Sequence, residues 1–183
     1  MTAPLPFPHD RQIKNMLEML FDKKVTFDRG QTVTAPAFAA VLRRDDGSVH
    51  GCVVGDAAAI ASFGALLSMS PSRVAREELA DGQPTMISKE NIGELANVLS
   101  GLYNASGAPH VKLAEVSFAT HEVYDAIGPI LEGHGRKADL VVTIADYPPA
   151  KVTLAINEEG FKPVEVKAPS GPAARKTGFD AWR

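Results

Sequence analysis

Glu94 and Asn97 are the residues whose types and spacing are best suited to chemistry in this sequence. A carboxylate can pair with a cation, and a carboxamide can both donate and accept hydrogen bonds. At about 100° per residue, positions three apart lie one turn apart on the same face of a helix. The pattern therefore predicts a carboxylate and a carboxamide side by side on the polar face of a helix, free to meet another molecule.

The helix that must hold this pair in place is expected over residues 88–103, with Ser88 as its cap. Its far side is apolar and should be buried through Ile92, Leu95, Leu99 and Leu102. Glu90 and Gly101 share the polar face and are candidate partner-binding residues, because a glycine lets a partner's backbone come close. Glu and Asn on a helix surface are usually only solvated, so an ordinary polar face is the alternative.

Length and composition indicate a single folded domain rather than a nucleic-acid-binding or membrane protein. The chain has 183 residues, of which 45% are hydrophobic and 22% are charged, enough to bury a proper core. A net charge of -3 provides no basic field for nucleic acid, and no run of about 18 apolar residues suggests a membrane span. The single cysteine, Cys52, has no disulfide partner, and the N-terminus lacks a signal-peptide pattern, so we expect a cytoplasmic protein.

Hydrophobic periodicity and turn residues predict an alternating series of helices and strands. The helices are expected at residues 9–22, 57–69, 71–80, 88–103 and 124–132, the last broken at Gly128-Pro129, and the strands at residues 24–28, 38–43, 49–54, 112–120, 138–145 and 151–156. This order predicts the α+β class, with an antiparallel sheet that carries its helices on one face. Residues 9–157 would form the domain, residues 1–8 a flexible N-terminus, and residues 158–183 a proline-rich basic tail that contains Phe179 and Trp182.

Motifs for other chemistries are missing from the sequence. It has no nucleophile elbow, no phosphate-binding loop and no zinc-protease motif. We expect no metal site, because no second ligand lies at helix or hairpin spacing from any of the five histidines, which are His9, His50, His110, His121 and His134. Cys52 is expected to be buried and inert, and Glu77-Glu78 to be solvated surface.

The motif Glu94-x2-Asn97-x3-Gly101 resembles the CheC/CheX/FliY family of bacterial chemotaxis phosphatases. A single Glu-x-x-Asn motif is most similar to CheX, because CheC carries two. The order of helices and hairpins over about residues 9–157 is also similar to that of the family. The resemblance implies a CheX-like fold.

The resemblance also implies a substrate and a role for each residue of the pair. The substrate would be the phosphorylated receiver domain of a response regulator (CheY-like). Its aspartyl phosphate lies beside Mg2+ in its own acidic pocket, so this chain would bind no cofactor itself. Asn97 would orient a water for in-line attack, and Glu94 would pair with a receiver lysine. The acyl phosphate already hydrolyses slowly, so such a catalyst contributes mainly position.

Two non-enzymatic functions are alternatives to the phosphatase. The chain can be an adaptor that binds a receiver domain without hydrolysing its phosphate, through the same face or through the tail. It can also be an assembly module, since CheX pairs through its sheet and the strand at residues 49–54 could extend a sheet across a homodimer.

Overall fold

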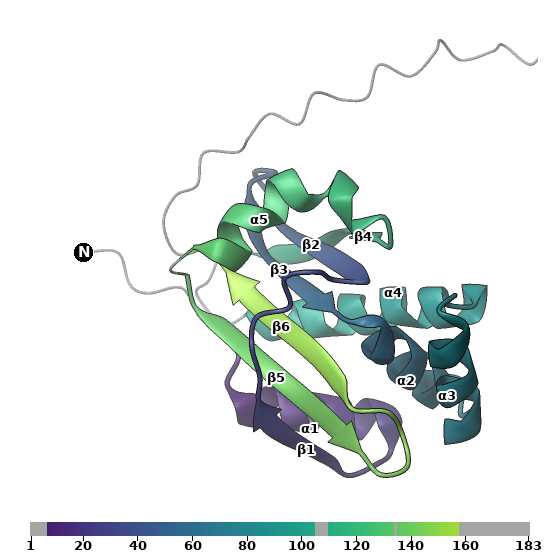
Figure 1. Cartoon of the computed structure of the whole chain (residues 1–183). Helices are drawn as coiled ribbons and strands as arrows, with labels where there is room; N and C mark the ends of the chain where they lie inside the picture. The colour runs from purple at the N-terminus through teal and green to yellow at the C-terminus, as the bar shows by residue number, and fades with distance from the viewer. Residues whose placement is uncertain (1–6, 105–109, 134, 158–183) are drawn as a thin grey trace, which may run out of the picture.

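The protein folds around a six-stranded antiparallel sheet, and its computed structural model describes residues 7–104, 110–133 and 135–157 (Figure 1). The strands are β1 (Val25–Arg29), β2 (Phe38–Arg44), β3 (Val49–Gly55), β4 (Val111–Ser117), β5 (Lys137–Ile144) and β6 (Ala150–Ile156). The helices are α1 (Asp10–Phe21), α2 (Ala57–Leu67), α3 (Ser72–Asp81), α4 (Met86–Ser100) and α5 (Tyr124–Glu132), with 3-10 turns η1 (Gly101–Tyr103) and η2 (Thr120–Glu122). The predicted α+β class is confirmed. The predicted tail, His134 and residues 1–6 lie outside the described residues. Among the helices of the described residues, none is long and apolar enough to cross a membrane.

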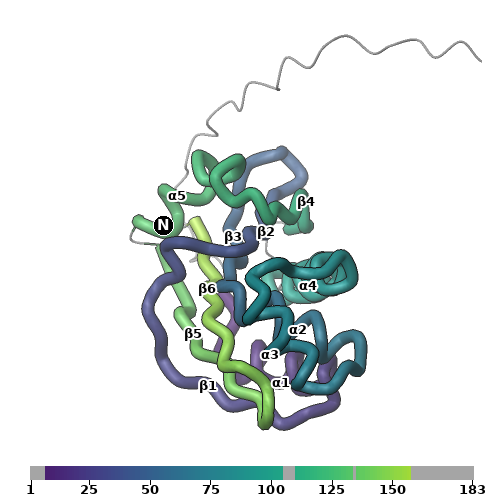
Figure 2. The backbone as a smooth tube through the Cα atoms, turned by 45° about the vertical axis from the view of Figure 1, so that its right-hand side comes forward, coloured from purple at the N-terminus to yellow at the C-terminus, as the bar shows by residue number. Residues whose placement is uncertain are grey.

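The sheet is covered on both faces, not on one only. Helices α1, α2 and α4 lie on one side, α3 packs on α2, and α5 lies on the opposite side, as Figures 1 and 2 show. Side chains of β3 alternate between the two layers, with Val53 in the core under α1 and α4 and with Cys52 and Val54 in a second apolar cluster under α5. A strand that is buried on both faces carries a nearly continuous apolar run, and Cys52-Val53-Val54 of β3 is such a run. The sequence analysis did not use this signal and so missed the second layer.

Strand β3 lies in the interior of the sheet. The strand order is β1-β5-β6-β3-β2-β4, so β3 pairs with both β2 and β6. The hairpin between β2 and β3 turns at Asp46-Gly47, where Gly47 has φ of 81°, a conformation that glycine adopts without strain. The expectation that residues 49–54 extend a sheet across a homodimer is therefore wrong, because this strand has no free edge.

The connection between β1 and β2 crosses the α5 side of the sheet (Figure 1). It is held there by polar contacts: Val33 N donates to Thr153 Oγ1 at 3.0 Å, and Thr153 Oγ1 donates to Asp139 Oδ1 at 2.7 Å. Thr32 Oγ1 donates to the other carboxylate oxygen of Asp139 at 3.2 Å. Asp139 thus ties the crossing segment to β5 and β6.

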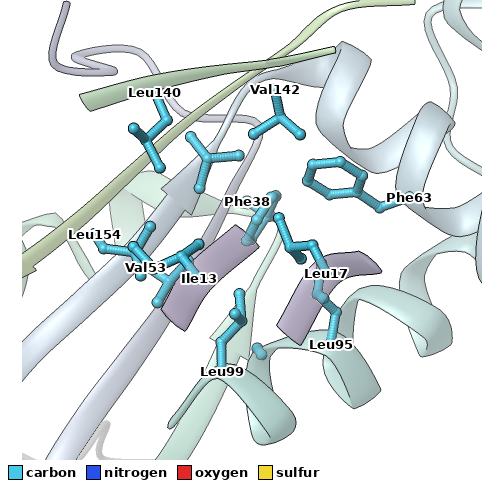
Figure 3. A pocket seen from close by; sticks show the side chains of 12 residues that line it. Ile13, Leu17, Phe38, Val53, Phe63, Leu95, Leu99, Leu140, Val142 and Leu154 are labelled. Atoms are coloured by element: carbon cyan, nitrogen blue, oxygen red, sulfur yellow. The ribbon is translucent and has the colours of Figure 1, made fainter. Parts of the chain in front are cut away.

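The main core lies between the sheet and helices α1, α2 and α4. Figure 3 shows Leu95 and Leu99 of α4 directed into it beside Ile13 and Leu17 of α1. The cavity among these side chains is about 10 Å3, no more than one water occupies. This space is a packed core and not a ligand site.

Helix α5 continues through the predicted break at Gly128-Pro129. Pro129 occupies the last turn of Tyr124–Glu132 and is exposed. A proline in a helix leaves the carbonyl four residues earlier without its usual donor, here the exposed residue Asp125, where water can replace the lost bond. The apolar side of α5 is buried against the sheet through Ile127, Ile130 and Leu131. This packing favours the continuous helix.

Candidate functional site on helix α4

The start of α4 is fixed by a network of hydrogen bonds, of which the one between Ser88 and Glu78 is buried. Thr85 is the cap, and its Oγ1 accepts from Ser88 N at 3.1 Å. Ser88, the cap expected from the sequence, lies inside the first turn and donates its Oγ to Glu78 Oε2 at 2.7 Å. The helix begins two residues earlier than predicted, because Thr85 has the extended backbone and the free hydroxyl that a cap requires.

Glu78 is not solvated surface, as the sequence suggested for Glu77-Glu78. It is only 6% exposed and accepts hydrogen bonds from the Thr85 backbone N–H and the Ser88 hydroxyl. A buried carboxylate requires such donors, and here both come from the first turn of α4. Glu78 therefore ties the end of α3 to the start of the helix that carries the site.

The rotation of α4 about its axis is set by its contact with α2. A Cβ on Gly64 would lie 2.6 Å from the Cβ of Ser88, so the two helices approach as closely as only a glycine allows. Asn91 Nδ2 donates to the Gly64 carbonyl at 2.9 Å and to Ser68 Oγ at 2.6 Å. Leu95 and Leu99 are turned to the core and are 2% and 3% exposed. Leu102 is only half-buried, because α4 ends at Ser100 and η1 follows.

The remaining face of α4 brings the predicted site residues together. Glu90, Glu94, Asn97 and Gly101 are all exposed on it. Within the described part of the chain, the side chains of Glu94 and Asn97 have neither a hydrogen bond nor an ion pair. A Cβ at Gly101 would meet nothing within 4 Å. The helix thus presents a free carboxylate and a free carboxamide about 4.5 Å apart along its axis, beside an open backbone position.

The sequence analysis missed three exposed apolar residues, two of which lie at the start of this face. Met86 and Ile87 open α4 and are 76% and 62% exposed, and Met69 at the end of α2 is 95% exposed. The signal that could have found Met86 and Ile87 is that they are adjacent apolar residues directly after a cap, Thr85. The prediction began the helix at Ser88 and so left this pair in the preceding loop.

A buried polar cluster lies behind the far end of α4. His50 Nδ1 accepts from Arg44 Nε at 3.1 Å, and burial, followed by the charge of Arg44, lowers the His50 pKa to about 4. The His50 and Tyr103 rings pack edge to face with their centroids 5.9 Å apart. The Phe7 ring packs against Tyr103 in the same way, with a centroid distance of 6.4 Å. His50 Nε2 and the Tyr103 hydroxyl are buried and unpaired within the described residues. The cluster anchors η1, and so has a structural role.

The other candidate groups are separate from the α4 face. Cys52 is buried, and burial raises its pKa to about 12, so the expectation of a buried, inert thiol is confirmed. His110 Nδ1 lies 3.2 Å from Asp45 Oδ1 on the surface, and the contact lowers the pKa of that carboxyl. Among the described residues no three His, Cys, Asp or Glu side chains are grouped closely enough to hold a metal ion.

Comparison with known proteins shows the fold. No family model matches the sequence, and no curated protein matches it. The X-ray crystal structure of Thermotoga maritima FliY is similar with a TM-score of 0.51 and 14% identity, over 78% of this chain and 81% of that chain. The FliM middle domain from Vibrio alginolyticus is similar with a TM-score of 0.50 and 8% identity, over 80% of this chain and 86% of that chain.

A third solved structure is the CheX-CheY-BeF3-Mg2+ complex from Borrelia burgdorferi, with a TM-score of 0.49 and 11% identity over 79% of this chain and 92% of the matched chain. That similarity is too low to support a conclusion. The likeness to FliY and the FliM middle domain supports the expected fold type and, at these identities, shows nothing about activity.

Proposed function

We propose that this protein is a CheX-like phosphatase that hydrolyses the aspartyl phosphate of a CheY-like receiver domain. The observation that carries the proposal is the free Glu94 and Asn97 pair on one outward face of a firmly held helix. The fold shared with FliY is consistent with it. Such a partner would place the protein in the cytoplasm.

The reaction needs little from the protein beyond position. The oxygen of a water attacks the phosphorus, the bond from phosphorus to the aspartyl oxygen breaks, and inorganic phosphate and a free aspartate carboxylate result. The Asn97 carboxamide would hold that water in line with the breaking bond, where its placement lowers the barrier. Mg2+ would be bound by the receiver and not by this chain.

The charges of the two residues suit separate tasks. A neutral carboxamide can approach a phosphoryl group that would repel a carboxylate. Glu94, one turn away, would pair with a receiver lysine beside the phosphate. Because Glu94 has no internal ion pair among the described residues, no existing contact must break for it to do so.

The framework of α4 fits this use. Glu78 and Thr85 hold its first turn, Asn91 holds its middle, and Leu95 and Leu99 anchor it to the core. A site carried on a fixed helix keeps its geometry when it enters another molecule. An exposed face of this kind acts in the pocket of a partner and not in a pocket of its own.

The test is phosphate loss from purified receiver domains that carry an acyl phosphate. Wild type should accelerate the loss for at least one receiver, and Asn97→Ala should reduce this acceleration about 100-fold or more, because the attacking water loses its position. Asn15→Ala is the matched control, since Asn15 is also exposed on a helix, α1. Equal acceleration by wild type and Asn97→Ala would contradict the proposed mechanism.

A receiver-binding adaptor is the second candidate function. It is favoured by the exposed Met86 and Ile87 beside the Glu94 pair, since exposed apolar groups with polar neighbours are typical of interaction sites. Binding of a receiver with no acceleration of phosphate loss would assign the protein to this class.

A further inference from the structure

Three of the four large apolar side chains that are exposed in the described structure lie on the first turn of α4 and at the end of α2, the helix that packs against it. They are Met69, Met86 and Ile87, which are 95%, 76% and 62% exposed, and we call them the apolar cap. Met86 and Ile87 are adjacent in the first turn of α4, and neighbouring exposed apolar side chains are typical of an interaction site.

The apolar cap is continuous with the Glu94 face. Ile87 precedes Glu94 by seven residues, which is two turns of helix, or about 10.5 Å along the same side. Met69 follows Ser68, whose hydroxyl is bound by Asn91 at 2.6 Å, so the end of α2 lies against the first half of α4. The cap and the charged pair therefore lie on neighbouring parts of one surface.

The conformation of Met69 strengthens this inference. Its φ is 54°, in the left-handed region that glycine and asparagine occupy more easily than methionine. A glycine at this exposed position after α2 would adopt the left-handed conformation with less backbone strain than methionine. A methionine here is consistent with a role outside the folded chain itself, since the flexible thioether side chain adapts to a partner's surface.

We propose that the apolar cap is the second contact for the receiver domain and sets which receiver this protein accepts. The inference rests on the proposed function. Glu90 and Glu94 have no cation bound to them among the described residues, so the partner should present a cation to them. Beside that cation, about 10 Å away, it should present apolar side chains to Met86 and Ile87. Receivers that lack this apolar patch would bind weakly, even with the lysine and the phosphate in place.

The test separates binding from turnover by using neutral substitutions. Met86→Gln/Ile87→Gln removes the apolar groups, keeps the charge and places good helix formers at the start of α4. Met69→Asn removes the third apolar side chain without adding charge, and asparagine tolerates the left-handed backbone at this position. Met19→Gln is the matched control, because Met19 is 69% exposed on α1, outside the cap. Binding is titrated with receiver domains in the Mg2+–beryllofluoride form, and phosphate release is measured at saturating protein.

The expected result is a Kd raised about tenfold or more by the cap variants, as for loss of an apolar anchor, with maximal phosphate release within about twofold of wild type. Met19→Gln should bind as wild type does. If wild type binds a receiver and both cap variants bind it with the same Kd, this inference alone would be overturned. Binding weakened by the cap variants without any acceleration of phosphate loss would overturn only the phosphatase and leave the cap supported. No binding of any receiver by wild type would overturn both.

Discussion

Protonation of His50 should make the domain less stable in mild acid, and substitution of this residue should remove the effect. His50 is 1% exposed, and its Nδ1 accepts from Arg44 Nε at 3.1 Å. Burial in the first place, and the Arg44 cation in the second, lower its pKa from 6.5 to about 4. The informative change is His50→Asn, because the Asn side-chain oxygen can still accept from Arg44 while nothing there titrates.

The sign and size follow from the two pKa values. In the unfolded chain the imidazole takes up a proton below pH 6.5, whereas in the folded protein it does so only near pH 4. Stability is therefore complete above pH 6.5 and falls as the pH drops from 6.5 toward 4. At pH 5 the gap is about 1.5 pKa units, which is about 2 kcal/mol of unfolding free energy. For a chain of this length that is a decrease in Tm of about 4–8 °C.

The assay is urea unfolding of both proteins at pH 7 and pH 5. His50→Asn will be less stable than wild type at pH 7, because the ring contact with Tyr103 is lost. Its further loss between pH 7 and pH 5 should be smaller than that of wild type by about 2 kcal/mol. Exposed groups such as Asp45 titrate equally in both proteins and cancel. If the two proteins lose equal free energy, His50 is not desolvated in the native state and the reasoning fails.

Three further changes test the framework of the site. Gly64→Ala should lower the free energy of unfolding in urea by about 1–3 kcal/mol, because the new Cβ would lie 2.6 Å from the Cβ of Ser88. Gly93→Ala is the control and should raise it by up to about 1 kcal/mol, because a Cβ there meets nothing within 4 Å. Equal effects of the two substitutions would refute the close approach of α2 and α4. Asp139→Ala should cost about 1–3 kcal/mol in urea unfolding, because the Thr153 hydroxyl loses the acceptor for its proton, and phosphate release should be unchanged. A neutral result would show that the crossing segment is held by other contacts. Deletion of residues 160–183 should leave the unfolding free energy unchanged, since that stretch has little apolar surface to pack; a domain that unfolds would show the tail to be part of the core.

Local chemistry made several features predictable. The apolar side of α4 repeats every three to four residues, so Leu95 and Leu99 had to be buried together, and this left Glu94 and Asn97 outward. Asp46-Gly47 predicts the turn between β2 and β3, because it joins two apolar runs. Asp56 caps α2 as its position indicated, accepting from Ala59 N at 2.9 Å. Each of these depends on neighbours within a few positions of the chain.

Non-local contacts decided the features that the sequence analysis got wrong. Glu78 looked like surface beside Glu77 and is buried, because Thr85 and Ser88 return from α4 to bind it. Strand β3 looked able to extend a sheet and is interior, because β6, about one hundred residues later, pairs with its second edge. Such pairings are set by the packing of whole elements, which no local pattern records.

Residue types and spacing by themselves determined that a carboxylate and a carboxamide share one helix face, because the helical repeat is a property of the backbone. Only the tertiary structure decided that this face is the outward one along its whole length. Gly64 lets α2 close against Ser88, Asn91 fixes the rotation of α4, and the core takes Leu95. The same packing leaves Met86 and Ile87 uncovered beside the pair. Exposure depends on which neighbours arrive, and those neighbours come from distant parts of the chain.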